Sequence, residues 1–128
     1  MFDKIRIIVG VDGSLQSKKA LAEAVTIAKS FSGFVKAIST YEKGGKEKAE
    51  EIISEAEKDL SKAGVAFDTS TVQGTNPAKT LATLAKQENF DLIVVGSRGI
   101  GGRVSALLGS VSKQVVGNAY CNVLVVKK

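Results

Sequence analysis

The sequence predicts a single α/β domain built on an open, parallel, five-stranded sheet of the Rossmann-like kind. Five short runs rich in β-branched residues are separated by four segments whose apolar residues recur every three or four positions. Strands that alternate with helices in this way form a parallel sheet with helices on both faces. The chain has 128 residues, of which 44% are apolar, which fits one domain spanning residues 1–128 with a core of its own.

The spacing of apolar residues changes after residue 11, which indicates a first strand followed by a first helix. Ile5–Val11 is a β-branched run, and the turn Asp12-Gly13-Ser14 ends it. From about Ser14 the apolar residues follow helical spacing, and either Ser14 or Ser17 can cap that helix. The apolar face of the predicted helix consists of Leu21, Ala24, Val25 and Ala28.

A second strand and a second helix are expected to follow. Phe34–Thr40 has the composition of a strand, although Lys36 interrupts it, and Tyr41–Lys46 is expected to form a loop. Gly64 is placed where the second helix should stop. The apolar face of that helix consists of Ile52, Ile53, Ala56, Leu60 and Ala63.

The next strand and helix are predicted around a proline. Val65–Val72 is β-prone, and Asn76-Pro77 has the pattern of an N-cap followed by proline at the first helical position. The apolar face of this third helix consists of Ala78, Leu81, Leu84 and Ala85.

The last part of the chain contains the most strand-like segment and a glycine-rich loop. Asp91–Gly96 is continuous and apolar, as expected of a strand covered on both faces. The loop Ser97–Gly102 follows it, and a fourth helix is expected over about Val104–Ala119. Asn122–Val126 is the expected fifth strand.

The residues that the chain lacks exclude several classes of site. It contains no histidine, which removes Ser-His-Asp and Cys-His catalysis and the commonest ligand of transition metals. Its one cysteine, Cys121, cannot form an internal disulfide or a CxxC metal site. No apolar run approaches the roughly 20 residues that span a bilayer, and Met1–Lys4 lacks the layout of a secretion signal. We therefore expect a cytoplasmic protein.

The net charge of +5 is unevenly distributed along the chain. Residues 1–64 carry a net charge of +1, whereas residues 65–128 carry +4. A basic half favours an anionic ligand, although a solvated surface can have the same composition. Lysine and arginine are not clustered among aromatic residues, so nucleic acid is not the expected partner.

Two loops are candidates for a ligand site. If the strand order is 3-2-1-4-5, the loops after the first and fourth strands flank one crevice at the carboxyl ends of the strands. Glycines in the second loop let backbone N–H groups approach a phosphate, and Arg98 and Arg103 can add charge-assisted bonds. Glycine-rich turns also serve tight packing alone, and Asp12 can equally act as a turn or capping residue.

Two common nucleotide motifs fail when they are tested against the sequence. The pattern G-x4-G-K-S/T is absent, because Gly45-Lys46 is followed by Glu47. The dinucleotide pattern G-x-G-x-x-G would begin at Gly99, but position 104 is valine. These failures argue against a P-loop NTPase and against a simple dinucleotide-binding fold.

Over essentially its whole length the chain resembles the universal stress protein family. The specific feature is Gly96-x2-Gly99-x9-Gly109-Ser110, which matches the nucleotide-binding pattern of that family with the correct spacing. Val11-Asp12-Gly13-Ser14, Asn76-Pro77-Ala78 and the closing Val123–Val126 support it. The resemblance implies strand order 3-2-1-4-5 and, because the glycine pattern is kept, binding of ATP together with Mg²⁺ or Mn²⁺.

The resemblance also implies which residues contact the nucleotide. Gly10 and Asp12 would line the adenosine side, with Asp12 near the ribose or a bound metal, and Ser39 would lie beside adenine, touching it through backbone atoms. Gly96 would lie near the ribose. The phosphates would be held by the remaining expected residues, which are Ser97, Arg98, Gly99, Gly101, Gly102, Gly109, Ser110, Val111 and Ser112. Two departures are Ile38–Tyr41, where an aliphatic pair is usual, and Cys121-Asn122, which stands where Cys-Pro is usual.

Three functions are compatible with these observations. The first is an ATP-binding stress or signalling module that is not primarily a catalyst, with at most slow hydrolysis or self-phosphorylation at Ser110 or Ser112. The second is a nucleotide-independent interaction module, since family members commonly form homodimers through the last strand, here Val123–Val126. The third is an adenine-nucleotide hydrolase, which is disfavoured because the turn after the first strand carries a single glycine.

Overall fold

The computed structural model describes residues 4–97, 114–117 and 119–127. Five parallel strands form one sheet in the order β3-β2-β1-β4-β5, which confirms the expected order. The strands are β1 (Arg6–Gly10), β2 (Phe34–Tyr41), β3 (Ala66–Gln73), β4 (Leu92–Gly96) and β5 (Asn122–Val126). The helices are α1 (Leu15–Phe31), α2 (Lys46–Ala63) and α3 (Pro77–Gln87), and residues 114–117 are also helical. The rest of the predicted loop after β4 and most of the fourth helix lie outside the described residues.

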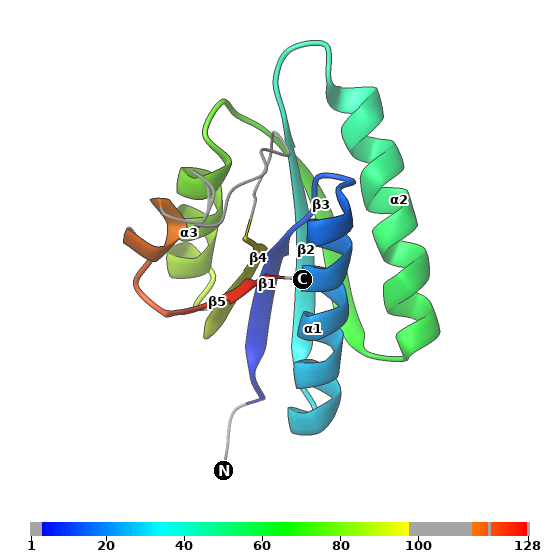
Figure 1. The fold of residues 1–128 in the computed structure, drawn as a ribbon, viewed down its shortest axis with the longest axis vertical. Coiled ribbons are helices and arrows are strands. Elements are labelled where there is room, and N and C mark those ends of the chain that lie inside the picture. The colour runs from blue at the N-terminus through cyan, green and yellow to red at the C-terminus, as the bar shows by residue number, and fades with distance from the viewer. Residues whose placement is uncertain (1–3, 98–113, 118, 128) are drawn as a thin grey trace.

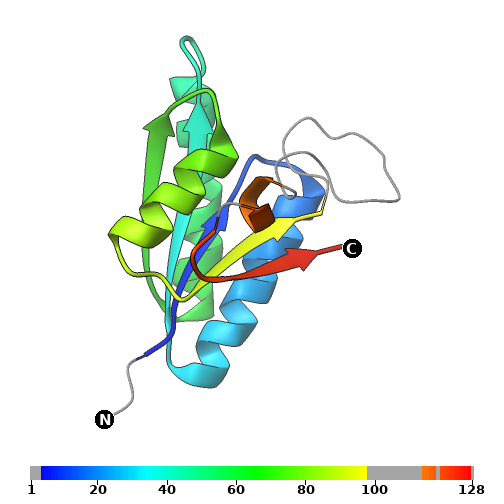
Figure 2. The same cartoon turned by 90° about the vertical axis from the view of Figure 1, so that its left-hand side faces the viewer.

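The described helices lie on both faces of the sheet (Figure 1). α1 and α2 lie on one face, whereas α3 and the short helical stretch 114–117 lie on the other (Figure 2). β1 is central, because it pairs with β2 through Ile7↔Val35 and with β4 through Ile7↔Leu92. β3 and β5 are therefore the two edges of the sheet.

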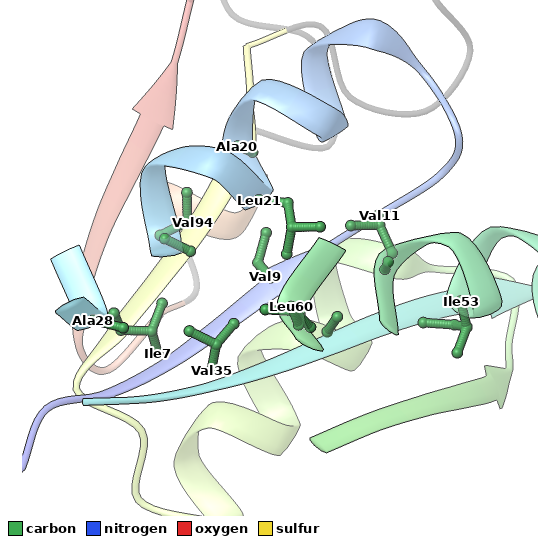
Figure 3. Close-up of a cluster of buried hydrophobic side chains, with 13 residues drawn as sticks. Ile7, Val9, Val11, Ala20, Leu21, Ala28, Val35, Ile53, Leu60 and Val94 are labelled. Carbon is green, nitrogen blue, oxygen red and sulfur yellow. The ribbon is translucent and has the colours of Figure 1, made fainter. Parts of the chain in front are cut away.

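A separate core fills each side of the sheet. On the α1 and α2 side, Ile7, Val9 and Val94 pack with buried helix residues such as Leu21 and Leu60 (Figure 3). The other side is packed by the alternate residues of the same strands. Its buried members are Ile8, Ile38, Ala78, Leu81, Ala85, Phe90, Ile93, Val95 and Val115. Because successive strand residues point to opposite faces, one apolar run supplies both cores.

The helix caps follow the local sequence. Ser14 is the N-cap of α1, and its hydroxyl accepts from the backbone N–H of Ser17 at 3.1 Å. Asn76 is the N-cap of α3, with its side chain accepting from the N–H of Lys79 at 3.1 Å and Pro77 beginning the helix. Gly64 ends α2 at a φ of 74°, where a glycine is favoured. These three predictions are confirmed.

The charge of Lys36 inside β2 is accommodated by ion pairs. Its side chain is only 14% exposed, and its ammonium lies 3.0 Å from a carboxylate oxygen of Glu88 and 3.9 Å from one of Asp68. Glu88 ends α3, so this ion pair also holds the C-terminus of α3 against the sheet. A charge that is mostly withdrawn from water is tolerable when it is paired in this way.

No helix in the described ranges is long and apolar enough to cross a membrane.

Candidate functional site

An open cleft lies at the carboxyl ends of the central strands β1, β2 and β4. This is the position at which open parallel sheets bind ligands, because the strand order reverses there. Its lining combines five apolar side chains with hydroxyl, amide and carboxylate groups. The lining residues are Gly10, Val11, Asp12, Ser14, Gln16, Ser17, Ile38, Thr40, Pro77, Leu81, Val95 and Gly96.

The turn after β1 fixes Asp12 at the cleft. Its Oδ1 accepts from the backbone N–H of Ser14 at 2.9 Å, and its own N–H donates to the hydroxyl of Ser17 at 3.2 Å. Asp12 therefore has the turn role considered from the sequence, and it also lines the cleft. The bond uses Oδ1, so the carboxylate carries a second oxygen for a ligand.

Two of the expected ligand glycines lie close to helices: Gly96 is required by packing against backbone, whereas Gly10 faces the movable end of a leucine side chain. A Cβ on Gly96 would lie 2.8 Å from Cβ and 3.0 Å from the backbone carbon of Gln16, so the first turn of α1 rests directly on the end of β4. A Cβ on Gly10 would lie 2.9 Å from a terminal methyl of Leu81 on α3. Both glycines line the cleft, and both let a helix approach the sheet closely.

Ser39 is placed differently from its neighbours in β2. Its side chain is buried at 1% exposed and does not line the cleft, whereas Ile38 and Thr40 do. The reason is the alternation of side chains along a strand, which turns residues 38 and 40 to one face and residue 39 to the other. A contact from the Ser39 backbone to adenine stays a prediction.

Ser97 also lies beside the cleft without lining it. Its N–H donates to the carbonyl of Val126 at 2.8 Å, which extends the pairing of β4 with β5, and its side chain is buried. The other predicted phosphate contacts fall outside the described residues, and so does Arg103. These contacts are Arg98, Gly99, Gly101, Gly102, Gly109, Ser110, Val111 and Ser112.

Nine residues that line the cleft were not singled out as ligand residues by the sequence, and four of them are helix residues. Gln16 and Ser17 enter because the first turn of α1 folds over the end of β4. Pro77 and Leu81 come from α3, where their pattern signalled only a helix start and an apolar face. No local sequence signal separates them from ordinary helix residues, because their place depends on how the helices pack.

The cleft combines apolar walls with a few polar groups, which is the usual character of a small-molecule site. Asp12 is the one carboxylate that lines it among the described residues. Within that same part of the chain, no group of three His, Cys, Asp or Glu residues is placed to hold a metal ion. A single carboxylate fits Mg²⁺ only where a ligand's phosphates complete the coordination, as is common for that ion.

Comparison with known proteins gives a consistent family match. The model of the universal stress protein family matches residues 5–127. Universal stress protein MJ0531 of Methanocaldococcus jannaschii is 34% identical over 140 residues, covering 96% of this chain and 82% of that protein.

Two solved structures show the same fold. One is a universal stress protein in complex with cAMP, with a TM-score of 0.79 and 26% identity over 95% of this chain and 96% of that chain. The other is the universal stress protein from Archaeoglobus fulgidus in complex with dAMP, with a TM-score of 0.80 and 24% identity over 98% of this chain and 100% of that chain.

Proposed function

This chain belongs to the universal stress protein family, and from that premise we propose that it binds ATP in the cleft at the carboxyl ends of β1 and β4. The observation that carries the proposal is that the glycine pattern begins at a residue that lines the cleft. Gly96, the first residue of Gly96-x2-Gly99-x9-Gly109-Ser110, lines the cleft opposite the turn that holds Asp12. The complexes of two similar structures with cAMP and dAMP support an adenine nucleotide as the ligand class.

Different residues of the cleft suit different parts of the proposed ligand. Val11, Ile38 and Leu81 offer apolar surface that suits the flat adenine ring. Asp12 offers a carboxylate oxygen to a ribose hydroxyl or to Mg²⁺ held by the phosphates. The amides of the segment after Gly96 would hold the phosphates, because glycines let backbone N–H groups approach an anion.

We propose that the bound nucleotide serves signalling in a cytoplasmic stress response and not rapid catalysis. Asp12 is the only carboxylate at the cleft in the described ranges, and it is engaged in the turn through Oδ1. The chain has no histidine to act as a general base. Slow hydrolysis or self-phosphorylation at Ser110 or Ser112 is compatible with this role.

Calorimetric titration with ATP in the presence of Mg²⁺ tests the ligand. Asp12→Asn keeps an oxygen that can accept from Ser14 while removing the charge, so we expect weaker binding with little loss of stability. Asp59→Asn is the matched control, because Asp59 is an exposed carboxylate on α2 that does not line the cleft. No heat from the wild-type protein at millimolar ATP would overturn the proposal.

A second variant tests the phosphate loop itself. Gly109→Val should abolish ATP binding while the circular dichroism spectrum stays that of the wild type. An unchanged affinity for ATP would show that the glycine pattern does not bind the phosphates. Titration with ADP, AMP and cAMP in parallel would rank the nucleotides, and mass spectrometry of any co-purified nucleotide would name the natural one.

We also propose a homodimer formed through β5. This strand lies at an edge of the sheet, and Val123, Leu124, Val125 and Val126 are only half-buried there. An apolar edge strand exposes unpaired backbone groups, which a second copy can satisfy. Size-exclusion chromatography with light scattering should give a dimer mass with and without ATP. A monomer under both conditions would exclude this interface.

A further inference from the structure

A second, open groove lies beside α3, between this helix and the residues that lead into β5. Its polar lining includes Lys79, Thr83, Lys86 and Gln87 from α3, together with Gln114 and Tyr120. It shares no lining residue with the cleft at the ends of β1 and β4.

The charge of this groove is uncompensated among the described residues. In the described part of the lining there are two lysines and no carboxylate. Neither Lys79 nor Lys86 forms an ion pair within the described ranges, whereas Lys36 on the same side of the sheet is paired with Glu88 and Asp68. α3 itself contains no acidic residue, so the positive charge of this surface continues along the helix.

Tyr120 gives the groove an aromatic surface. Its side chain is 76% exposed, which is high for a large aromatic residue, and the ammonium of Lys86 lies 4.2 Å from the ring centroid. This cation–π contact holds the lysine head beside the ring. Tyrosine is enriched at protein-recognition surfaces, so an exposed ring in a groove favours a protein ligand.

We propose that this groove binds an acidic, extended segment of a partner protein. Lys79 and Lys86 are separated by two turns of α3, which corresponds to about 10 Å along the helix axis. In a polyproline II segment, residues three apart lie on one side at a spacing of about 9 Å. Carboxylates at every third position of such a segment can therefore meet both lysines, with the chain running past Tyr120.

A peptide fits the described groove better than a nucleic acid. A nucleic acid carries a phosphate on every nucleotide and needs a longer row of cations than the two that line this groove among the described residues. Sequence-tolerant binding of single strands also needs several aromatic stacking platforms, and in the described part of the lining Tyr120 is the one aromatic side chain.

The test is fluorescence anisotropy of the full chain with a labelled peptide that repeats Glu-Pro-Ser. We expect saturable binding that weakens when salt is raised from about 50 mM to about 500 mM, because exposed charges are screened. The same peptide with Gln in place of Glu should not bind. Lys79→Glu combined with Lys86→Glu should weaken binding of the Glu peptide by about tenfold or more.

The control is Lys19→Glu combined with Lys58→Glu. These lysines are exposed on α1 and α2, on the opposite face of the sheet, and their reversal changes the net charge by the same amount. We expect the affinity for the peptide to change less than twofold in this control. Affinity for ATP should be unchanged in both double variants, so this test is independent of the nucleotide proposal.

Three results would overturn the proposal. The first is no binding of the Glu peptide to the wild-type chain at millimolar concentration. The second is an equal loss in both double variants, which would reduce the effect to net charge. The third is tighter binding of an oligothymidine of similar length than of the peptide, which would make this groove a nucleic-acid surface.

Discussion

The helices described on the two faces of the sheet differ in the charge they carry and in what they line. α2 carries six acidic and four basic residues on the first face, whereas α3 carries two lysines and no acid on the second. Residues of α1 and of α3 both line the proposed nucleotide cleft, whereas the groove beside Lys79 and Lys86, here called the basic groove, is lined by α3 and by no residue of α1 or α2 in the described ranges. The comparison shows that, among the described helices, α3 takes part in both hollows, while α1 contributes only its first turn to the cleft.

The largest effect is expected when one buried leucine from each face is replaced by alanine. Leu60 on α2 is fully buried, and Leu81 on α3 is buried but also lines the cleft. Leu60→Ala and Leu81→Ala should each lower the free energy of unfolding by about 2–5 kcal/mol. Only Leu81→Ala should also weaken ATP binding, because it removes a wall of the cleft. Urea unfolding and calorimetry measure the two effects, and a loss of affinity in Leu60→Ala would contradict the division.

The next test concerns Gly96, which ends β4 and lies against the first turn of α1. Gly96→Ala places a methyl group 2.8 Å from Cβ and 3.0 Å from the backbone carbon of Gln16, so the first turn of α1 must shift. We expect a loss of about 1–3 kcal/mol in stability, as for other overpacked sites. Gly74→Ala is the control, since its nearest contact would be 3.4 Å from the hydroxyl of Thr80. Equal stability of the two variants in thermal unfolding would contradict the close approach.

The two helix caps sharpen the comparison at a smaller scale. Ser14→Ala and Asn76→Ala each remove one side-chain acceptor from a helix N-terminus and should each cost about 1 kcal/mol. Ser14 lines the cleft and Asn76 lines the basic groove. Ser14→Ala should therefore lower ATP affinity, while Asn76→Ala should leave it unchanged. The reverse pattern in a titration would place the nucleotide in the basic groove instead of the cleft.

The smallest expected effect concerns Cys121 at the start of β5. Burial, and secondarily the charge of Asp91, raises the pKa of this thiol above its ordinary value of 9.0. As the pH rises, the unfolded chain therefore loses the thiol proton before the folded chain does. The stability contributed by the neutral thiol is present below pH 9 and is lost as the pH rises above it.

Denaturant unfolding of the wild type and Cys121→Ala between pH 8 and about pH 10 measures this contribution. The difference in stability between the two chains should change in favour of Cys121→Ala as the pH rises. A constant difference would show that the thiol titrates equally in both states. Lysine and tyrosine titrate in both chains, so they cancel in the difference.

Part of the cleft was predictable from the sequence. Asp12 follows from the end of the first strand and Gly96 from the end of the fourth, whereas Gly10 came from the resemblance to the family. Thr40 was not predicted, although Ser39 beside it was, because a shift of one residue along a strand changes the face to which a side chain points. The register that decides between these neighbours is a property of the whole sheet.

The order of the described elements, the N-caps of α1 and α3 and the end of α2 could be predicted from the sequence, because these features depend on neighbours in the chain. Ser14, Gly64 and Asn76 act on backbone groups within a few residues of themselves. Only the tertiary structure decided that Gln16 rests on Gly96, that Leu81 fills the space beside Gly10, and that Lys86 meets Tyr120. Those contacts join segments far apart in the chain, and their geometry is set by how the helices pack on a shared sheet.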